Sequence, residues 1–277
     1  MHPPLSELVA SARVVSLPLA VKFRGLWRRE LMLFQGPQGW TEFSPFVEYN
    51  DDEAAHWLKA AIEFGWSALP ELHRDSIMVN ATVPAVAADQ VAEVLSHFDG
   101  CRTAKVKVGE PGQQLSDDVA RVREVHRILG PEGRIRVDAN AAWNVDEAEH
   151  AFHALAVFDL EYVEQPCASL EELAELRQRT HYMDVPIAAD ESIRKAEDPR
   201  AVAQAVAADV LVLKAQPLGG ISKIVELSEE VALPIVLSSA LESSVGIAMG
   251  LYAAAAVKVL DYDCGLGTAS LLAGDVT

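Results

Sequence analysis

The chain of 277 residues is 50% hydrophobic and carries 41 acidic against 23 basic residues, which gives a net charge of −18. This length suits an α/β barrel with a small additional domain, and the hydrophobic fraction suffices for a large core. The negative charge argues against general binding to nucleic acids or anionic membranes. An anionic substrate would therefore need a local cluster of cations.

Three cysteines, Cys101, Cys167 and Cys264, are too few and too scattered for a disulfide framework, which indicates a reducing compartment. The first residues show no basic segment followed by an apolar one, so no signal peptide is predicted. The most apolar stretch, Val245 to Val257, is shorter than the roughly 20 residues that span a bilayer. We therefore expect a soluble, cytoplasmic protein with neither a nucleic acid nor a membrane as partner.

Residues 1–75 differ in character from the remainder and predict a small α+β domain. The strands of an antiparallel meander are predicted at 12–19, 29–34 and 40–43. The segment 21–28 between the first two strands is rich in basic and aromatic side chains and is expected to form a loop. Asn50 or Asp51 can cap a helix that ends at Phe64, because apolar residues recur along one face of this segment.

From Ser76 onwards the pattern changes to alternating strands and helices. Strands are predicted at 77–81, 104–108, 135–138, 162–164, 187–189, 210–214 and 235–237, and 262–266 can add an eighth. The predicted helices include 87–97, 116–129, 145–157 after Asn144, and one that opens with a capping box at 169–172. Strands rich in Val, Ile and Leu, each followed by one helix, indicate a parallel sheet covered by helices. Seven or eight such units fit a closed TIM-type barrel over residues 76–277 better than an open sheet.

Three neighbouring strands of this barrel end at an acidic residue. These acids are Asp138, Glu164 and Asp190, with intervals of 164 − 138 = 26 and 190 − 164 = 26 residues. Because the carboxyl ends of barrel strands meet at one face, the three carboxylates would converge and repel one another. A hard divalent cation removes this repulsion, and oxygen ligands suit Mg²⁺, with Mn²⁺ as a substitute. The alternative, that each acid merely caps the following helix, explains three acids in register less well.

Three lysines are expected at the same face. Lys105 and Lys107 alternate with valines along the second strand, so both would point into the barrel, where they need an acidic or anionic partner. Lys214 ends the sixth strand and points to the same region. One inward lysine is often structural, but lysines beside a metal site can also serve as acid–base groups.

Two further segments follow later strands. Ser238 and Ser239, with the free amides of the following helix, could bind a substrate carboxylate, although an ordinary helix cap explains them equally well. Gly219 and Gly220 after the sixth strand are similarly ambiguous. No nucleophile elbow, Cys-x-x-Cys pair or histidine metal spacing appears.

Together these residues resemble the enolase superfamily, in its muconate-lactonizing-enzyme-like subgroup. The resemblance covers nearly the whole chain: the small first domain, Lys-x-Lys at 105–107, the three acids and Lys214. It implies a modified (β/α)7β TIM-type barrel with an N-terminal α+β capping domain. It also implies proton abstraction next to a carboxylate, followed by an enediolate that Mg²⁺ stabilises.

The resemblance also implies a role for each residue. Asp138, Glu164 and Asp190 would ligate the metal. Lys107 would take the proton and Lys214 would stabilise the enediolate. The remaining groups would support these residues or contact the substrate: Lys105, Asn140, Ser238, Ser239, Gly219, Gly220 and Arg24, the last as a lid.

Within the subgroup, the segments 213–220 and 238–246 are most similar to a carbon–oxygen lyase of menaquinone biosynthesis that dehydrates a small anionic carboxylate. Racemases of N-acylamino acids, dipeptide epimerases and cycloisomerases carry similar segments and stay open as alternatives. Two other classes also stay open: a Schiff-base aldolase that uses Lys107 or Lys214, and a barrel that only binds an anionic metabolite. The sequence does not determine the oligomeric state.

Overall fold

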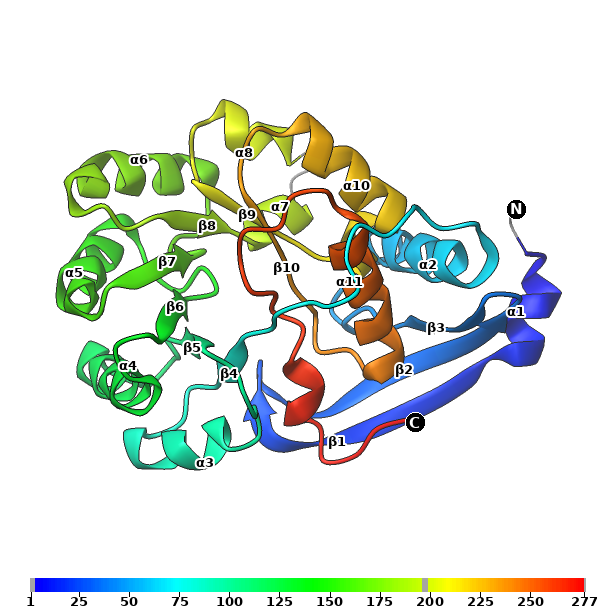
Figure 1. Cartoon of the computed structure of the whole chain (residues 1–277), viewed down its shortest axis with the longest axis horizontal. Coiled ribbons are helices and arrows are strands. Elements are labelled where there is room, and N and C mark those ends of the chain that lie inside the picture. Colours follow the sequence, from blue (N-terminus) through cyan, green and yellow to red (C-terminus); the bar gives the residue numbers. More distant parts are fainter. Residues whose placement is uncertain (1–2, 196–198, 277) are drawn as a thin grey trace.

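The computed structural model describes residues 3–195 and 199–276. Within these residues the strands form two sheets, one of three strands and one of seven (Figure 1). The three-stranded sheet comprises β1 (Arg13–Phe23), β2 (Leu26–Gly36) and β3 (Gly39–Phe43). It is antiparallel in the order β1-β2-β3, as the sequence predicts.

The connection between β1 and β2 is tighter than expected. Phe23 pairs with Leu26, so only Arg24 and Gly25 form the turn, and both have positive φ angles of 51° and 77°. The prediction of a loop over 21–28 was therefore wrong for most of its length. The reason is that its alternating side chains continue the two strands.

Two helices complete the first part of the chain. Helix α2 (Asp51–Trp66) begins after Asn50, whose side chain accepts a hydrogen bond from the amide of Glu53 in a capping box. Helix α1 (Leu5–Ser11) was not predicted, since it is short and buries only Leu8.

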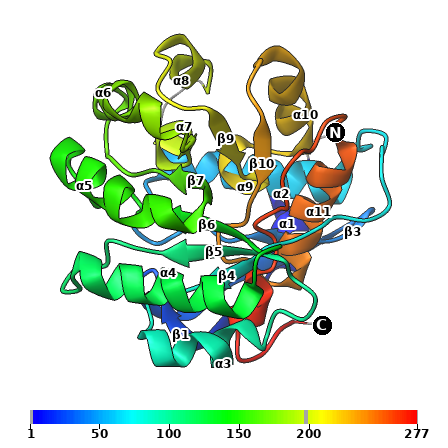
Figure 2. The ribbon, with the colours of Figure 1, turned by 60° about the vertical axis from the view of Figure 1, so that its left-hand side comes forward.

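The seven-stranded sheet is parallel and curls on itself, with its helices on the outside (Figure 2). Its strands are β4 (Ala81–Val83), β5 (Thr103–Lys107), β6 (Arg134–Asp138), β7 (Leu160–Glu164), β8 (Ile187–Ala189), β9 (Val210–Leu213) and β10 (Ile235–Leu237). They pair in chain order, which is the pattern of a barrel rather than of a doubly wound sheet. The predicted fold class is thus confirmed.

The barrel closes through the segment that was expected to form an eighth strand. Cys264 makes a parallel bridge with Val79, and Gly265 makes one with Ser238. Backbone hydrogen bonds of 2.8 Å, from Cys264 N to Met78 O and from Gly265 N to Leu237 O, join the two edges. The predicted strand at 77–81 begins too early. The backbone of residues 78–80 bonds to this closing segment, and regular pairing with β5 begins at Ala81.

The remaining helices are α3 (Val91–Leu95), α4 (Leu115–Leu129), α5 (Val145–Leu155), α6 (Leu170–Thr180), α7 (Glu191–Lys195), α8 (Arg200–Gln204), α9 (Ala215–Leu218), α10 (Ile221–Glu230) and α11 (Ser244–Ala256). Asn144 and Ser169 cap α5 and α6 as predicted. The helix predicted at 87–97 is instead a 3-10 turn at 88–90 followed by α3. No helix in the described ranges is long and apolar enough to cross a membrane.

The interior of the barrel below the strand ends is partly apolar and partly charged. Tyr162, Ala188, Val210, Val212 and Val236 pack together inside it. Beside them lies a fully buried guanidinium, which comes from Arg136 and stacks 4.8 Å from the centroid of the Tyr162 ring. This packed lower layer supports the polar cluster above it.

Candidate active site

The carboxyl ends of β6 and β7 and the turn after β8 bring the three predicted acids together. Asp138 pairs with Glu164 in the β6–β7 register, and Glu164 pairs with Ala188 of β8, two residues before Asp190. The three acidic residues are at most 1% exposed. Since parallel strands in register end at one edge, the even spacing along the chain becomes proximity in space.

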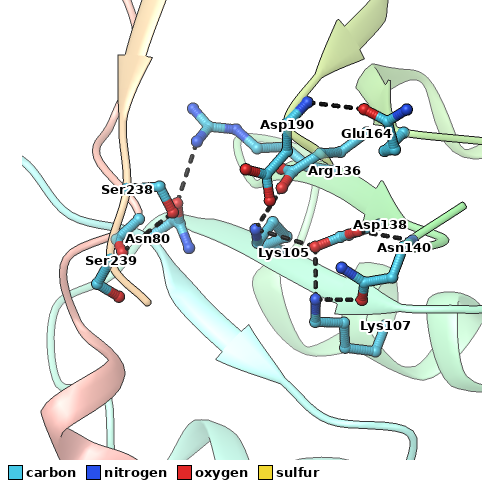
Figure 3. A network of polar contacts seen from close by, with 12 residues as sticks. Asn80, Lys105, Lys107, Arg136, Asp138, Asn140, Glu164, Asp190, Ser238 and Ser239 are labelled. Atoms are coloured by element: carbon cyan, nitrogen blue, oxygen red, sulfur yellow. Dashed lines mark hydrogen bonds and ion pairs between the residues drawn. The ribbon is translucent and has the colours of Figure 1, made fainter. Parts of the chain in front are cut away.

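Two lysines of β5 contact two of these carboxylates, those of Asp138 and Glu164 (Figure 3). Lys105 Nζ lies 2.8 Å from Glu164 Oε1 and 3.1 Å from Asp138 Oδ2. Lys107 Nζ lies 2.5 Å from Asp138 Oδ2 and 2.5 Å from Asn140 Oδ1. Both lysines point inward, as the alternation with valines predicts.

Lys214 follows β9 and reaches the cluster from another side. Its Nζ lies 2.5 Å from Asp190 Oδ2. Lys107 and Lys214 line the same cavity, together with Asp138 and Asp190. Two ammonium groups from β5 and from the end of β9 thus face one space across the carboxylates.

Burial and charge set the protonation states of the cluster. Burial raises the pKa of Asp138, but the ammonium groups of Lys107 and Lys105 outweigh it and hold this pKa well below its usual range. Burial and the Asp138 carboxylate raise the pKa of Glu164 to about 7. Burial also lowers the pKa of Lys105, but Glu164 and Asp138 overcome this and raise it well above its ordinary value. Lys105 is therefore a fixed positive charge.

The three carboxylates are donors of the type that suits a divalent cation, although lysines now contact them. Within the ranges that the structure describes, no three His, Cys, Asp or Glu side chains are gathered closely enough to hold a metal ion. Lys105 contacts Asp138 and Glu164, and Lys214 contacts Asp190. However, buried carboxylate oxygens are the ligands that hard cations prefer. Among the described residues, the buried Oε2 of Glu164 has no hydrogen-bond partner. Cation binding would require the lysines to release some of these oxygens.

Three of the predicted supporting residues, Ser238 and Ser239 after β10 and Asn140 after β6, also line the cavity. Ser238 and Ser239 line it, and the Ser239 hydroxyl is 2.6 Å from that of Thr268. Asn140 has a left-handed backbone conformation with φ 47°, and its backbone amide donates a hydrogen bond to Asp138 Oδ1 at 3.0 Å. Asn140 therefore fixes both Asp138 and Lys107.

Arg24 reaches the cavity, whereas the two predicted glycines do not. The guanidinium of Arg24 lies 4.1 Å from the centroid of the Phe46 ring, and both side chains line the cavity. Gly219 and Gly220 instead form the turn between α9 and α10, with φ angles of 87° and 126°. This turn faces α2, since a Cβ at Gly220 would come within 2.8 Å of Glu63 Cδ.

Sequence reasoning missed Gln165, which orients one of the acids. Gln165 is fully buried with φ 39°, and its Oε1 accepts hydrogen bonds from the amides of Asp190 at 2.9 Å and Ser192 at 3.1 Å. Its position directly after Glu164 was the available signal. Phe46, in the loop after β3, and Thr268, at the start of a 3-10 helix, also line the cavity and carried no comparable signal.

The fold and the acid–lysine cluster agree with the family comparisons. Residues 14–65 match a family model described as enolase N-terminal domain-like, and residues 87–276 match one described as enolase C-terminal domain-like. The chain therefore belongs to the enolase superfamily. Membership of this superfamily indicates a divalent metal as cofactor.

Curated relatives with high sequence identity to the chain are o-succinylbenzoate synthases. The chain is 56% identical to the o-succinylbenzoate synthase of Mycobacterium tuberculosis (strain ATCC 25618 / H37Rv), across 99% of this chain and 82% of the relative. It is 54% identical to the o-succinylbenzoate synthases of Mycolicibacterium smegmatis and Mycobacterium leprae, across 99% and 100% of this chain and 84% and 81% of those proteins.

Solved structures with lower identity share the fold. The L-Ala-D/L-Glu epimerase of Bacillus subtilis superposes with a TM-score of 0.80 at 24% identity, over 96% of this chain and 90% of that one. The muconate lactonizing enzyme of Pseudomonas putida gives a TM-score of 0.75 at 21% identity, over 96% and 89%. At these identities the likeness establishes the architecture alone.

Proposed function

We propose that the chain is a carbon–oxygen lyase that dehydrates 2-succinyl-6-hydroxy-2,4-cyclohexadiene-1-carboxylate to o-succinylbenzoate in menaquinone biosynthesis. The observation that carries the reaction class is the placement of Lys107 and Lys214 at one cavity beside the three buried carboxylates. The choice of substrate rests on the o-succinylbenzoate synthases that are 54% to 56% identical to the chain.

The proposed cofactor is Mg²⁺, with Mn²⁺ as a substitute. Asp138, Glu164 and Asp190 would hold it, because oxygen donors from three adjacent strands suit a hard cation. When bound, the cation would neutralise the charge that develops on the substrate carboxylate as the neighbouring proton is lost.

Lys107 is the proposed base. Its Nζ faces the cavity, and the oxygens of Asp138 and Asn140, each 2.5 Å away, fix its position. Lys107, in its neutral amine form, would accept the proton from the ring carbon that carries the carboxylate and become an ammonium, and the C–H electron pair would pass into that carboxylate. The same ammonium would then donate the proton to the departing hydroxyl, so the C–O bond breaks, water leaves and the ring becomes aromatic.

Lys214 and Lys105 would supply positive charge beside the reacting carbon. Lys214 lies across the cavity and would stabilise the negative charge of the enediolate as an ammonium ion. Lys105, held in the charged form by Glu164 and Asp138, would keep the site positive around Lys107.

The cavity walls would bind the rest of the substrate. Ser238 and Ser239 would donate hydrogen bonds to the succinyl side, and Arg24 would attract an anionic group from the turn of the first domain. The proposed partner is thus a small carboxylate.

We also propose that residues 1–75 form a capping domain and residues 76–277 a barrel domain. A cytoplasmic location is proposed as well, because the three cysteines Cys101, Cys167 and Cys264 are free thiols.

A direct comparison of substrates tests the proposal. The full chain with Mg²⁺ is supplied with the cyclohexadiene carboxylate in one assay and with N-succinylamino acids in deuterated water in another. We expect o-succinylbenzoate in the first assay and slower or no α-proton exchange in the second. Exchange of the α-proton of N-succinylamino acids, without dehydration of the cyclohexadiene carboxylate, would show instead that the site belongs to a racemase or epimerase.

A further inference from the structure

A second polar network lies between the capping sheet and the loop after β10. It contains Arg29 of β2, Glu42 of β3 and Glu242 of the loop, which are 2%, 0% and 4% exposed. None of the three lines the cavity or belongs to the acid–lysine cluster. A role in proton transfer therefore does not explain why these three charged side chains are buried here.

The network holds the backbone of the loop at several successive points. Arg29 Nε donates to the carbonyl of Leu241 at 3.1 Å. Glu242 Oε2 accepts from the amide of Ala240 at 2.5 Å, and Glu42 Oε2 accepts from the amide of Ser243 at 3.1 Å. Leu241 has a left-handed conformation with φ 66°, which a leucine adopts only where its surroundings impose it.

The loop held in this way is one wall of the cavity. Residues 238–241 all line it. The Arg29 guanidinium also lies 4.3 Å from the centroid of the Phe46 ring, which lines the cavity as well. One arginine thus supports the part of the wall at 238–241 and the part at Phe46, which follows β3.

The charges of the network are unusual for a purely stabilising contact. Burial, and then the neighbouring Glu242 carboxylate, raise the pKa of Glu42 to about 7. Burial also raises the pKa of Glu242 and lowers that of Arg29. Apolar residues of similar volume often stabilise a buried interface as well as an ion cluster does, whereas directional polar contacts specify one geometry.

We infer that Arg29, Glu42 and Glu242 are positioning residues that fix the cavity wall at 238–241 against the capping sheet and so determine the affinity for the substrate. They act through the loop and touch no reacting atom. Only the identity of the ligand rests on the proposed function; the anchoring of the loop does not.

Glu63 provides a matched control. It also belongs to the first domain and also accepts hydrogen bonds at the start of a barrel helix, from the amides of Ile221 and of Ser222, the latter at 3.2 Å. Its contacts are with α10 and not with the loop 238–243. Glu63→Leu therefore loosens the attachment of the first domain without releasing the cavity wall.

The first experiment measures amide hydrogen exchange in the full chain without substrate. In Arg29→Met and Glu42→Leu, we expect the amides of residues 240–246 to exchange about tenfold faster or more, while those of 221–222 stay protected. Glu63→Leu should give the reverse pattern. Glu42→Gln is the rescue variant, because its amide oxygen can replace Oε2, and it should retain protection. Equal exchange at 240–246 in all variants would overturn the anchoring.

The second experiment measures steady-state dehydration and the Kd for o-succinylbenzoate. Arg29→Met and Glu42→Leu should raise KM and Kd about tenfold with kcat within about threefold, the pattern of lost binding without lost chemistry. Glu42→Gln and Glu63→Leu should stay near the wild type. Unchanged KM in the first two variants, or an equal rise in Glu63→Leu, would overturn the inference. Absence of dehydration by the wild type would instead refute the proposed function, and the exchange experiment would still decide the anchoring.

Discussion

Lys107 is the residue on which the proposed chemistry depends most. Its Nζ is held 2.5 Å from Asp138 Oδ2, which Lys105 Nζ also contacts at 3.1 Å. Removal of Lys107 therefore takes away the proton acceptor but leaves Asp138 with a counter-ion.

We expect Lys107→Ala to lower kcat by about 100- to 10,000-fold, the usual contribution of a positioned acid–base group. Steady-state kinetics checks this, with circular dichroism as the control for folding. A kcat within tenfold of the wild type would remove Lys107 from the mechanism and favour a barrel that only binds its ligand.

The raised pKa of Glu42 predicts that the stability of the protein depends on pH. This pKa is about 7 in the folded protein, against an ordinary value of 4.5, because of burial and then Glu242; Arg29 opposes the rise. The folded state therefore binds the Glu42 proton more tightly, so the contribution of Glu42 to stability is fully present below pH 4.5 and is lost as the pH rises through about 7. Glu42→Gln has no such titration.

The wild type should therefore lose about 3 kcal/mol of unfolding free energy relative to Glu42→Gln between these two pH values. Urea denaturation of both proteins at pH 5, 6, 7 and 8 measures the difference. Parallel curves for the two proteins would contradict a titration of Glu42 in this window.

At the scale of elements, β2 and α2 approach each other closely at two glycines. A Cβ on Gly36 would come within 2.7 Å of the backbone carbon of Gly65. Backbone cannot move aside as a flexible side chain can, so Gly36→Ala must separate the strand from the helix.

We expect Gly36→Ala to destabilise the protein by about 1 to 3 kcal/mol, as overpacking of a close contact does. Gly274→Ala is the control, since nothing lies within 4 Å of a Cβ there. Thermal denaturation compares the three proteins. Equal stability of Gly36→Ala and Gly274→Ala would mean that the helix and the strand are not packed this closely.

The sequence predicted elements where the pattern of one segment determines its structure. The parallel strands and the capping boxes at Asn144 and Ser169 follow from local periodicity and local hydrogen bonds. The tight turn at Arg24 and Gly25 and the position of Gly220 against α2 depend on pairing and packing with distant segments. Those features could not be read from local patterns.

At the scale of the whole molecule, the same distinction applies to the site. The acids, Lys107 and Lys214 were predictable because each sits at or just after a strand end, and the barrel brings strand ends together; Lys105 was predictable from its alternation with valines along β5. The network of Arg29, Glu42 and Glu242 was not, since Glu42 and Ser243 are 201 residues apart and neither segment specifies its partner. Residues that join two domains carry no periodic signal.

A divalent cation should stabilise the whole protein. A ligand that binds only the folded state adds about 2.7 kcal/mol at a concentration of 100 times its Kd. We therefore expect the melting temperature to rise with Mg²⁺ in the absence of substrate and to be insensitive to Mg²⁺ in Asp190→Asn. A melting temperature that does not respond to Mg²⁺ in the wild type would argue against the proposed ligands.

The most direct test of the central proposal is the rate of o-succinylbenzoate formation from the cyclohexadiene carboxylate by the full chain, measured before chelation, in chelator and after Mg²⁺ is restored. We predict a loss of at least about 100-fold in chelator, since a metal ion supplies several kcal/mol to such a step, and full recovery with Mg²⁺. A rate that chelation leaves unchanged, or no o-succinylbenzoate under any condition, would contradict it.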